Sequence, residues 1–187
     1  MFHLLLFTLG LVFLGTTSNL VDCVAMELDL DRFEQISGFN LIDFSKMRVR
    51  KFNRTTYVLD GEFELFEDLN DKYQGAVTCA YSALGNNQWN EYPFKISKDK
   101  LCNVFNGAYK EYQEYFVEST NLPRVGDDWL CPFPKGKYWV RNLAPKADWV
   151  PKVVPAGYWR LTMWLYDTKD EVVFKAHFFM KLTKGYF

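Results

Sequence analysis

The last third of the chain alternates apolar and polar residues with a period of two, and this pattern constrains the fold more than any other. The stretch GYWRLTMWLY (157–166) is followed by DTKDE and then by VVFKAHFFMKL (172–182). Successive residues of a strand point to opposite faces of a sheet, so this period predicts two strands. The short link between them predicts an antiparallel hairpin with a loop of about five residues.

The two faces of this hairpin differ in polarity. The drier face carries Trp159, Leu161, Met163 and Leu165 on the first strand and Val172, Phe174, Ala176, Phe178, Met180 and Leu182 on the second. The opposite face of the second strand carries Lys175, His177 and Lys181. Such a sheet packs its apolar side on a core and turns the other side to water. We therefore expect His177 at the surface and not in a catalytic cluster.

Further strands and one helix precede this hairpin. Residues 43–52 and 56–66 predict another hairpin, in which Gly61 marks a bulge, and residues 72–84 predict a strand. Residues 98–120 change to helical spacing, with Ser97 as a candidate cap. Their apolar stripe consists of Leu101, Val104, Phe105, Ala108, Tyr112, Tyr115 and Phe116.

Two segments share a turn signal. DWLCPFPKGKYWVR (128–141) and DWVPKVVPAGYWR (148–160) both place P-x-G directly before an aromatic strand, and proline and glycine together favour a tight turn there. The sequence thus predicts a mostly β fold: an antiparallel β-sandwich or β-cup of seven to eight strands, with one inserted helix at about 98–120.

The first residues, MFHLLLFTLGLVFLG, predict a secretory signal peptide. The apolar run is shorter than the about 20 residues of a membrane span. We expect residues 1–18 to be removed, although cleavage after Cys23 or Ala25 also fits. Residues 26–187 then form a single domain in a secreted, extracellular protein.

The four cysteines, Cys23, Cys79, Cys102 and Cys131, allow three disulfide connectivities, and secretion makes disulfides the default. Without a CxxC pair, and with His177 as the one histidine after cleavage, we expect no metal site. A net charge of −1 gives no general attraction to nucleic acid. The 17 Phe, 11 Tyr and 6 Trp either fill a core or line a cavity for an apolar ligand.

No group of polar residues in the sequence has the pattern of a catalytic site. The acidic pairs Glu62/Glu64 and Asp127/Asp128 and the basic row Lys46, Arg48 and Arg50 have the spacing of solvated strand faces or loops, and the chain contains no G-x-S-x-G motif. We therefore expect a protein that is not an enzyme. Asn53-Arg54-Thr55 is an N-glycosylation sequon placed in a predicted turn.

Three stretches carry a resemblance to a known family. These are LCNVFNGAYKEY, CPFPKGKYWVRN and VPAGYWRLTMWLYD. They resemble the ML-type lipid-recognition domains, the family of the ganglioside activator protein, and are most similar to its insect CheB-like chemosensory branch. The C-P-F-x-x-G-x-Y motif is met at Cys131, Pro132, Phe133, Gly136 and Tyr138, and G-x-Y/W-R-[IL] at Gly157, Trp159, Arg160 and Leu161.

The resemblance covers roughly residues 75–182 and implies a β-cup around an apolar pocket. It implies a disulfide between Cys102 and Cys131. The family's bond from an N-terminal cysteine to the last strand has no partner here, because residues 172–182 contain no cysteine. Cys23 either leaves with the signal peptide or pairs with Cys79.

The expected function is that of a secreted carrier without a cofactor. Its ligand would be a lipid or hydrocarbon, such as a cuticular hydrocarbon pheromone, and it could contact a membrane surface or a receptor. The candidate lipid-binding residues are Leu59, Phe63, Leu65, Val140, Leu161, Met163, Leu165, Phe174, Phe178 and Met180. The alternative is an extracellular protein-interaction module, a receptor co-factor with a filled core and no lipid ligand.

Overall fold

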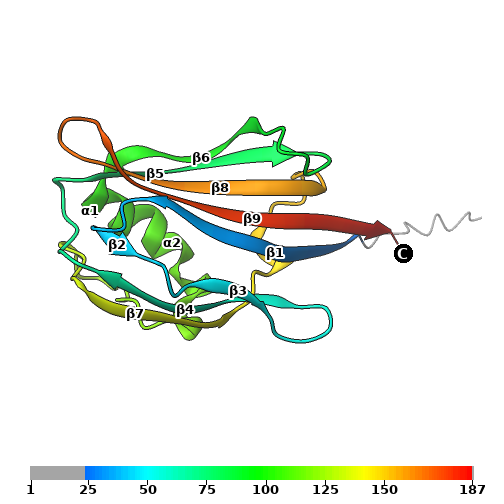
Figure 1. Ribbon diagram of the computed structural model, residues 1–187, viewed down its shortest axis with the longest axis horizontal. Coiled ribbons are helices and arrows are strands. Elements are labelled where there is room, and N and C mark those ends of the chain that lie inside the picture. The colour runs from blue at the N-terminus through cyan, green and yellow to red at the C-terminus, as the bar shows by residue number, and fades with distance from the viewer. Residues whose placement is uncertain (1–23, 187) are drawn as a thin grey trace, which may run out of the picture.

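Two antiparallel sheets face each other in the computed structural model, which describes residues 24–186 (Figure 1). The larger sheet has the strand order β1 (Val24–Ser37), β9 (Val172–Tyr186), β8 (Gly157–Tyr166), β5 (Gln74–Ser82), β6 (Asn90–Lys100). The smaller sheet contains β2 (Ile42–Asp43), β4 (Tyr57–Leu65) and β3 (Arg48–Lys51), and β7 (Gly136–Leu143) pairs with the other edge of β4. The mostly β antiparallel sandwich or cup is confirmed, with nine strands where seven to eight were expected.

The C-terminal hairpin forms as predicted. β8 and β9 pair antiparallel around the loop 167–171, with Leu161 opposite Phe178 and Met163 opposite Ala176. Phe174, Ala176 and Leu182 are buried, as predicted for the apolar face, whereas Val172 at the start of β9 is 45% exposed. The strand continues to Tyr186, because β1 pairs with β9 along nearly its whole length.

Two strands were not predicted from the sequence, and one of them shortens the helix. β1 lies at one edge of the larger sheet, and its bulge between Leu30 and Arg32 interrupts the alternation. β6 lies at the other edge, and most of its residues are exposed. An edge strand without a buried face lacks the period that identifies strands. Because β6 extends to Lys100, the helix begins at Leu101, and Lys100, not Ser97, takes the N-cap position.

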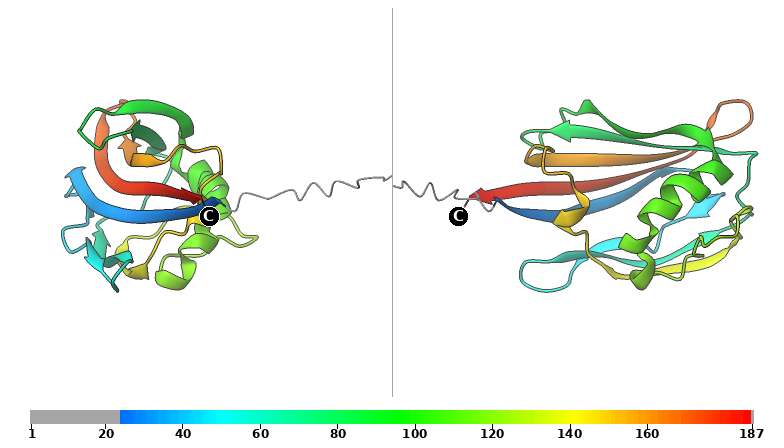
Figure 2. Two further views of the ribbon diagram at one scale, coloured as in Figure 1. Left: turned by 90° about the vertical axis from the view of Figure 1, so that its right-hand side faces the viewer. Right: turned by 180° about the vertical axis from the view of Figure 1, so that it is seen from behind.

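A helical segment spans residues 101–119 and is interrupted at Phe116. It comprises α1 (Leu101–Val104), a π-helical turn (Phe105–Tyr109), α2 (Lys110–Tyr112) and 3₁₀ turns at Gln113–Tyr115 and Val117–Ser119. Seen from behind, it runs between the two sheets, with β6 on one side and β7 on the other (Figure 2, right). The end view shows the larger sheet curving around the opposite side (Figure 2, left). The helix therefore closes the open side of the cup.

The P-x-G segments turn the chain into their strands as predicted. Gly136 and Gly157 have φ of 156° and 141° and are the first residues of β7 and β8. This backbone region favours glycine. At Gly157 a side chain would also collide, because a Cβ there would lie 2.7 Å from the Tyr81 ring.

Part of the space between the sheets is filled by side chains. Leu30, Met47, Leu59 and Val140 form a buried cluster, and half-buried rings pack on it. The Phe33 and Phe178 ring centres lie 4.7 Å apart, and those of Phe44 and Phe63 lie 4.5 Å apart. The interior between β1, β9, β3, β4 and β7 is therefore a packed core.

The disulfide implied by the resemblance is present. Cys102 in α1 is bonded to Cys131, which precedes β7, and the Cys102 amide donates to Asp71 Oδ1. Cys79 on β5 is buried and has no disulfide partner among residues 24–186, and burial raises the pKa of its thiol to about 11. The proposed signal peptide 1–18 and Cys23 lie outside the described residues. A cleavage after Ala25 would remove the first two residues of β1.

Removing this disulfide should destabilise the fold strongly. The bond joins residues 29 positions apart, and closing a loop of that size contributes about 3–4 kcal/mol in the chain-entropy model. We expect the double variant Cys102→Ser/Cys131→Ser to lose that much free energy of unfolding in urea titrations. Cys79→Ala, which removes a thiol and no cross-link, is the control. A double variant as stable as the wild type would contradict the prediction.

Candidate functional site

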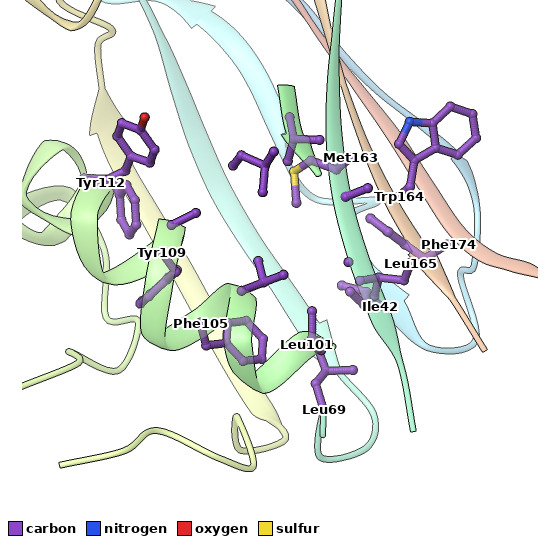
Figure 3. Close-up of a pocket in the computed structure, with 17 residues that line it drawn as sticks. Ile42, Leu69, Leu101, Phe105, Tyr109, Tyr112, Met163, Trp164, Leu165 and Phe174 are labelled. Carbon is purple, nitrogen blue, oxygen red and sulfur yellow. The ribbon is translucent and has the colours of Figure 1, made fainter. Parts of the chain in front are cut away.

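An apolar pocket of about 270 Å³ lies between the inner side of the larger sheet and the helix (Figure 3). The sheet contributes Gly75, Ala76, Val77, Ile96, Met163, Trp164, Leu165 and Phe174. The helical segment contributes Leu101, Val104, Phe105, Ala108, Tyr109, Tyr112 and Phe116, and Ile42 and Leu69 complete the lining. The volume lies between a benzene-binding cavity of about 150 Å³ and the about 300 Å³ at which drug-sized sites begin. The pocket is partly open to solvent.

The predicted apolar stripe of the helix forms one wall of this pocket. Its residues recur every three or four positions and so share one face of the helix. Leu101, Phe105, Tyr109 and Tyr112 follow one another along that face in Figure 3. Six of the seven predicted stripe residues line the pocket, while Tyr115 faces away and stacks on Trp149 with ring centres 5.0 Å apart. The sequence thus predicted the stripe but did not show that it lines a pocket.

The helix is held from outside the pocket by two amide side chains. Asn106 Nδ2 donates to the Leu130 carbonyl (3.0 Å), and the Leu130 amide donates back to Asn106 Oδ1 (2.8 Å). Gln113 makes the same reciprocal pair with Val125, at 2.8 Å in both directions. Asn106 and Gln113 are seven residues, or about two turns, apart, so they lie on one side of the helix. They tie it to the segment 121–131, which we call the strap.

The pocket offers little polarity. None of its lining residues is charged. Tyr109 donates its hydroxyl to the Pro123 carbonyl at 2.7 Å, and burial raises its pKa to about 12, so it stays protonated. The Trp164 indole donates to Thr78 Oγ1 at 3.1 Å, and its ring points away from the helix (Figure 3). This arrangement suits the binding of an uncharged apolar molecule, because the lining gains from burying apolar surface and provides no counter-ion.

The missing side chain of Gly75 helps to keep this space open. A Cβ at Gly75 would lie 2.8 Å from Leu101 Cδ1, 3.6 Å from Val104 Cγ2 and 3.7 Å from Leu165 Cδ2, all of them lining residues. The backbone at Gly75 does not adopt a positive φ. The position therefore uses glycine for its small size. A glycine inside a strand was the one sequence signal that could have indicated it.

The structure separates the ten predicted lipid-binding residues into two groups. Met163, Leu165 and Phe174 line the pocket. The other seven do not. Leu59 and Val140 belong to the packed cluster, against which Phe63, Phe178 and Met180 pack. Leu65 lies in the neighbouring buried cluster, and Leu161 is half-buried on β8. The alternation of apolar and polar residues identified the inner face of the sheets, but not which part of that face lines a pocket and which part packs against other side chains.

The prediction of a surface His177 is wrong. His177 lies on the outer face of β9 as expected, but only 8% of it is exposed, and its Nδ1 lies 2.9 Å from Thr162 Oγ1. Long side chains cover this face, since the Arg160 guanidinium lies over the Trp89 ring and that of Arg32 over the Phe179 ring. Burial, followed by the positive charges of Arg160 and Lys175, lowers the pKa of His177 to about 4.

The other polar candidates do not enter the pocket. Glu62 pairs with Arg141 at 3.2 Å and Glu64 with Lys137 at 3.8 Å. Arg50 forms an ion pair with Asp60. The remaining polar candidates are exposed: Lys46, Arg48, Asp127 and Asp128. Asp71 lies close to the sulfur atoms of Cys102 and Cys131, but the disulfide occupies both sulfurs, so this group is not a metal site.

The comparisons with known proteins concern the region that carries the pocket. Residues 76–161 match a family described as a protein of unknown function, DUF1091. The matched region runs from β5 into β8 and contains the whole helix, the strap and both cysteines of the disulfide. A search of curated proteins found no match. Among the described residues, no helix is long and apolar enough to cross a membrane.

The depressed pKa of His177 predicts a loss of stability in acid. An unfolded histidine titrates near pH 6.5, whereas His177 in the fold titrates at about 4. The unfolded state therefore binds more protons between these values, and the neutral ring's contribution, complete above pH 6.5, is lost as the pH falls toward 4. We expect His177→Gln to be less stable than the wild type in urea at pH 7.5, with the gap narrowing by pH 4.5. Parallel stability profiles would contradict this assignment.

Proposed function

We propose that this protein is a secreted carrier that holds one small hydrophobic molecule in the pocket beneath the helix. The observation that carries the proposal is the apolar pocket of about 270 Å³ without a charged lining residue. Burying eight methylene groups there would contribute about 6 kcal/mol before ordering costs are subtracted. That is enough for a measurable affinity without any ion pair.

The resemblance to ML-type lipid-recognition domains supports the same proposal. The disulfide between Cys102 and Cys131, the helix and the cup of antiparallel strands occur together, as that resemblance implied. By this analogy the ligand is a lipid or a hydrophobic chemosensory compound such as a cuticular hydrocarbon pheromone, and the protein acts by binding and release and not by catalysis. Release would take place at a membrane surface or a receptor. A long chain would place one segment in the pocket and extend through its opening.

The alternative, a protein-interaction module with a filled core, fits only part of the interior. The cluster around Leu59 and Val140 is filled. The space under the helix is not. Ligand binding therefore decides between the two functions.

Filling part of the pocket should weaken binding without unfolding the protein. We expect Gly75→Val to weaken binding of the neutral fluorophore N-phenyl-1-naphthylamine by about tenfold or more, because the new side chain would occupy the space between Leu101 and Leu165. The measurement is a fluorescence titration, with the fold checked by circular dichroism. Gly126→Val in the strap is the matched control, since nothing lies within 4 Å of a Cβ there. Wild-type protein that binds neither this probe nor any apolar compound would overturn the carrier proposal.

Secretion predicts a glycan at Asn53. This residue is exposed in the loop between β3 and β4, and its Oδ1 accepts hydrogen bonds from the Thr55 amide (2.9 Å) and the Thr55 hydroxyl (3.3 Å). We expect protein from insect-cell medium to carry extra mass that peptide N-glycosidase F or A removes. Asn53→Gln and Thr55→Ala should lack it, and Thr55→Ser should retain it. Retention of the protein in the cells would contradict secretion. Secretion without a glycan would contradict glycosylation at Asn53.

A further inference from the structure

We propose that the pocket takes a neutral ligand with an apolar chain and one oxygen function at its end, such as an alcohol, aldehyde, ketone or ester, and that the Tyr112 hydroxyl hydrogen-bonds that oxygen. This inference rests on the proposed carrier function and specifies the class of ligand.

The lining offers no counter-charge to an ionised group. It consists of aliphatic and aromatic residues together with the small residues Gly75, Ala76 and Ala108. It contains no lysine, arginine, histidine, aspartate or glutamate. An ionised carboxylate beside the half-buried Tyr112 would lose part of its hydration and gain no counter-charge. A fatty acid should therefore bind more tightly in its protonated form, which is scarce at neutral pH.

The surface of the pocket is almost wholly apolar, so the polar groups of its tyrosine and tryptophan residues lie at its edge or outside it, and one of them is free to bind a ligand at the opening. The Tyr109 hydroxyl already donates to the Pro123 carbonyl, and the Trp164 indole already donates to Thr78. An indole has a single N–H and accepts nothing, so Trp164 has no further capacity. The Tyr112 hydroxyl has no hydrogen-bond partner among residues 24–186. It can donate one hydrogen bond to an oxygen and also accept one from an alcohol.

The place of Tyr112 gives the ligand a direction. Figure 3 shows Leu69 and Leu101 at one end of the lining and Tyr112 at the other, with Met163 across from it on the sheet. Leu69 and Leu101 are 6% and 3% exposed, whereas Tyr112 is only half-buried. The apolar tail would point toward the buried leucines, and the oxygen would remain at the more accessible end beside Tyr112. The eleven residue steps from Leu101 to Tyr112 span roughly 16 Å of helix, enough for a chain of medium length.

Four ten-carbon compounds test this ligand class against each other. Decane, 1-decanol, decanal and decanoate compete with N-phenyl-1-naphthylamine at pH 7.5 for the full secreted protein. We expect decanol and decanal to bind about three- to tenfold more tightly than decane, the range that one net hydrogen bond provides. Decanoate should bind more than tenfold more weakly than decanol, and its affinity should rise as the pH falls toward 5. Decanoate that binds as tightly as decanol would overturn the inference.

The matched pair of variants tests the role of Tyr112. Tyr112→Phe should reduce the affinities for decanol and decanal to that for decane and leave the decane affinity unchanged. Tyr109→Phe removes a hydroxyl that is already bonded to Pro123, so it should retain the preference for the oxygenated compounds. A Tyr112→Phe protein that keeps this preference overturns the inference alone. Wild-type protein that binds none of the compounds overturns the carrier function and this inference together.

Discussion

The pocket depends on how the helix is held. An apolar helix face normally collapses onto the sheet it covers until side chains interdigitate at the density of a molecular crystal. Here the start of the helix is fixed by the bond between Cys102 and Cys131, and its far side is tied to the strap by Asn106 and Gln113. These bonds position the helix from outside, while Gly75 on the facing strand presents no side chain. The helix therefore covers the sheet without filling the space beneath it.

The parts of the fold that could be predicted are those in which one face of an element is buried. Alternation identified β8 and β9 because Phe174, Ala176 and their neighbours pack on a core while the intervening residues do not. The P-x-G segments were predictable for a local reason, since the first residue of each strand has a backbone conformation that favours glycine. β6 could not be found in this way, because an edge strand that is mostly exposed has no hydrophobic period, and Pro93 argues against a strand.

The site was less predictable than the fold, because a cavity depends on how closely two layers of the structure approach each other. The sequence showed that Leu59 and Met163 both face inward, and both do. Leu59 meets other side chains across the interior, whereas Met163 faces the tethered helix and lines the pocket. No period in the sequence separates these two cases. The prediction of an exposed His177 was wrong for a related reason. Alternation placed it on the polar face, but the arginines and aromatic rings that cover this face come together only in the tertiary structure.

The division of the interior into a filled and an open part has an energetic consequence. The cluster around Leu59 and Val140, with the phenylalanine rings that pack on it, gives the two sheets a packed core that does not involve the helix. An empty apolar cavity costs about 24 cal/mol for each Å³, so 270 Å³ would cost at most about 6 kcal/mol, less where water reaches the open side. That is comparable to the whole stability of many domains. A fold can keep such a space only if the packed part and the disulfide offset its cost, and a ligand that fills the space restores the lost contacts. Binding should therefore stabilise the helix and the strap more than the sheets, because they are the part of the fold that the empty pocket leaves least supported.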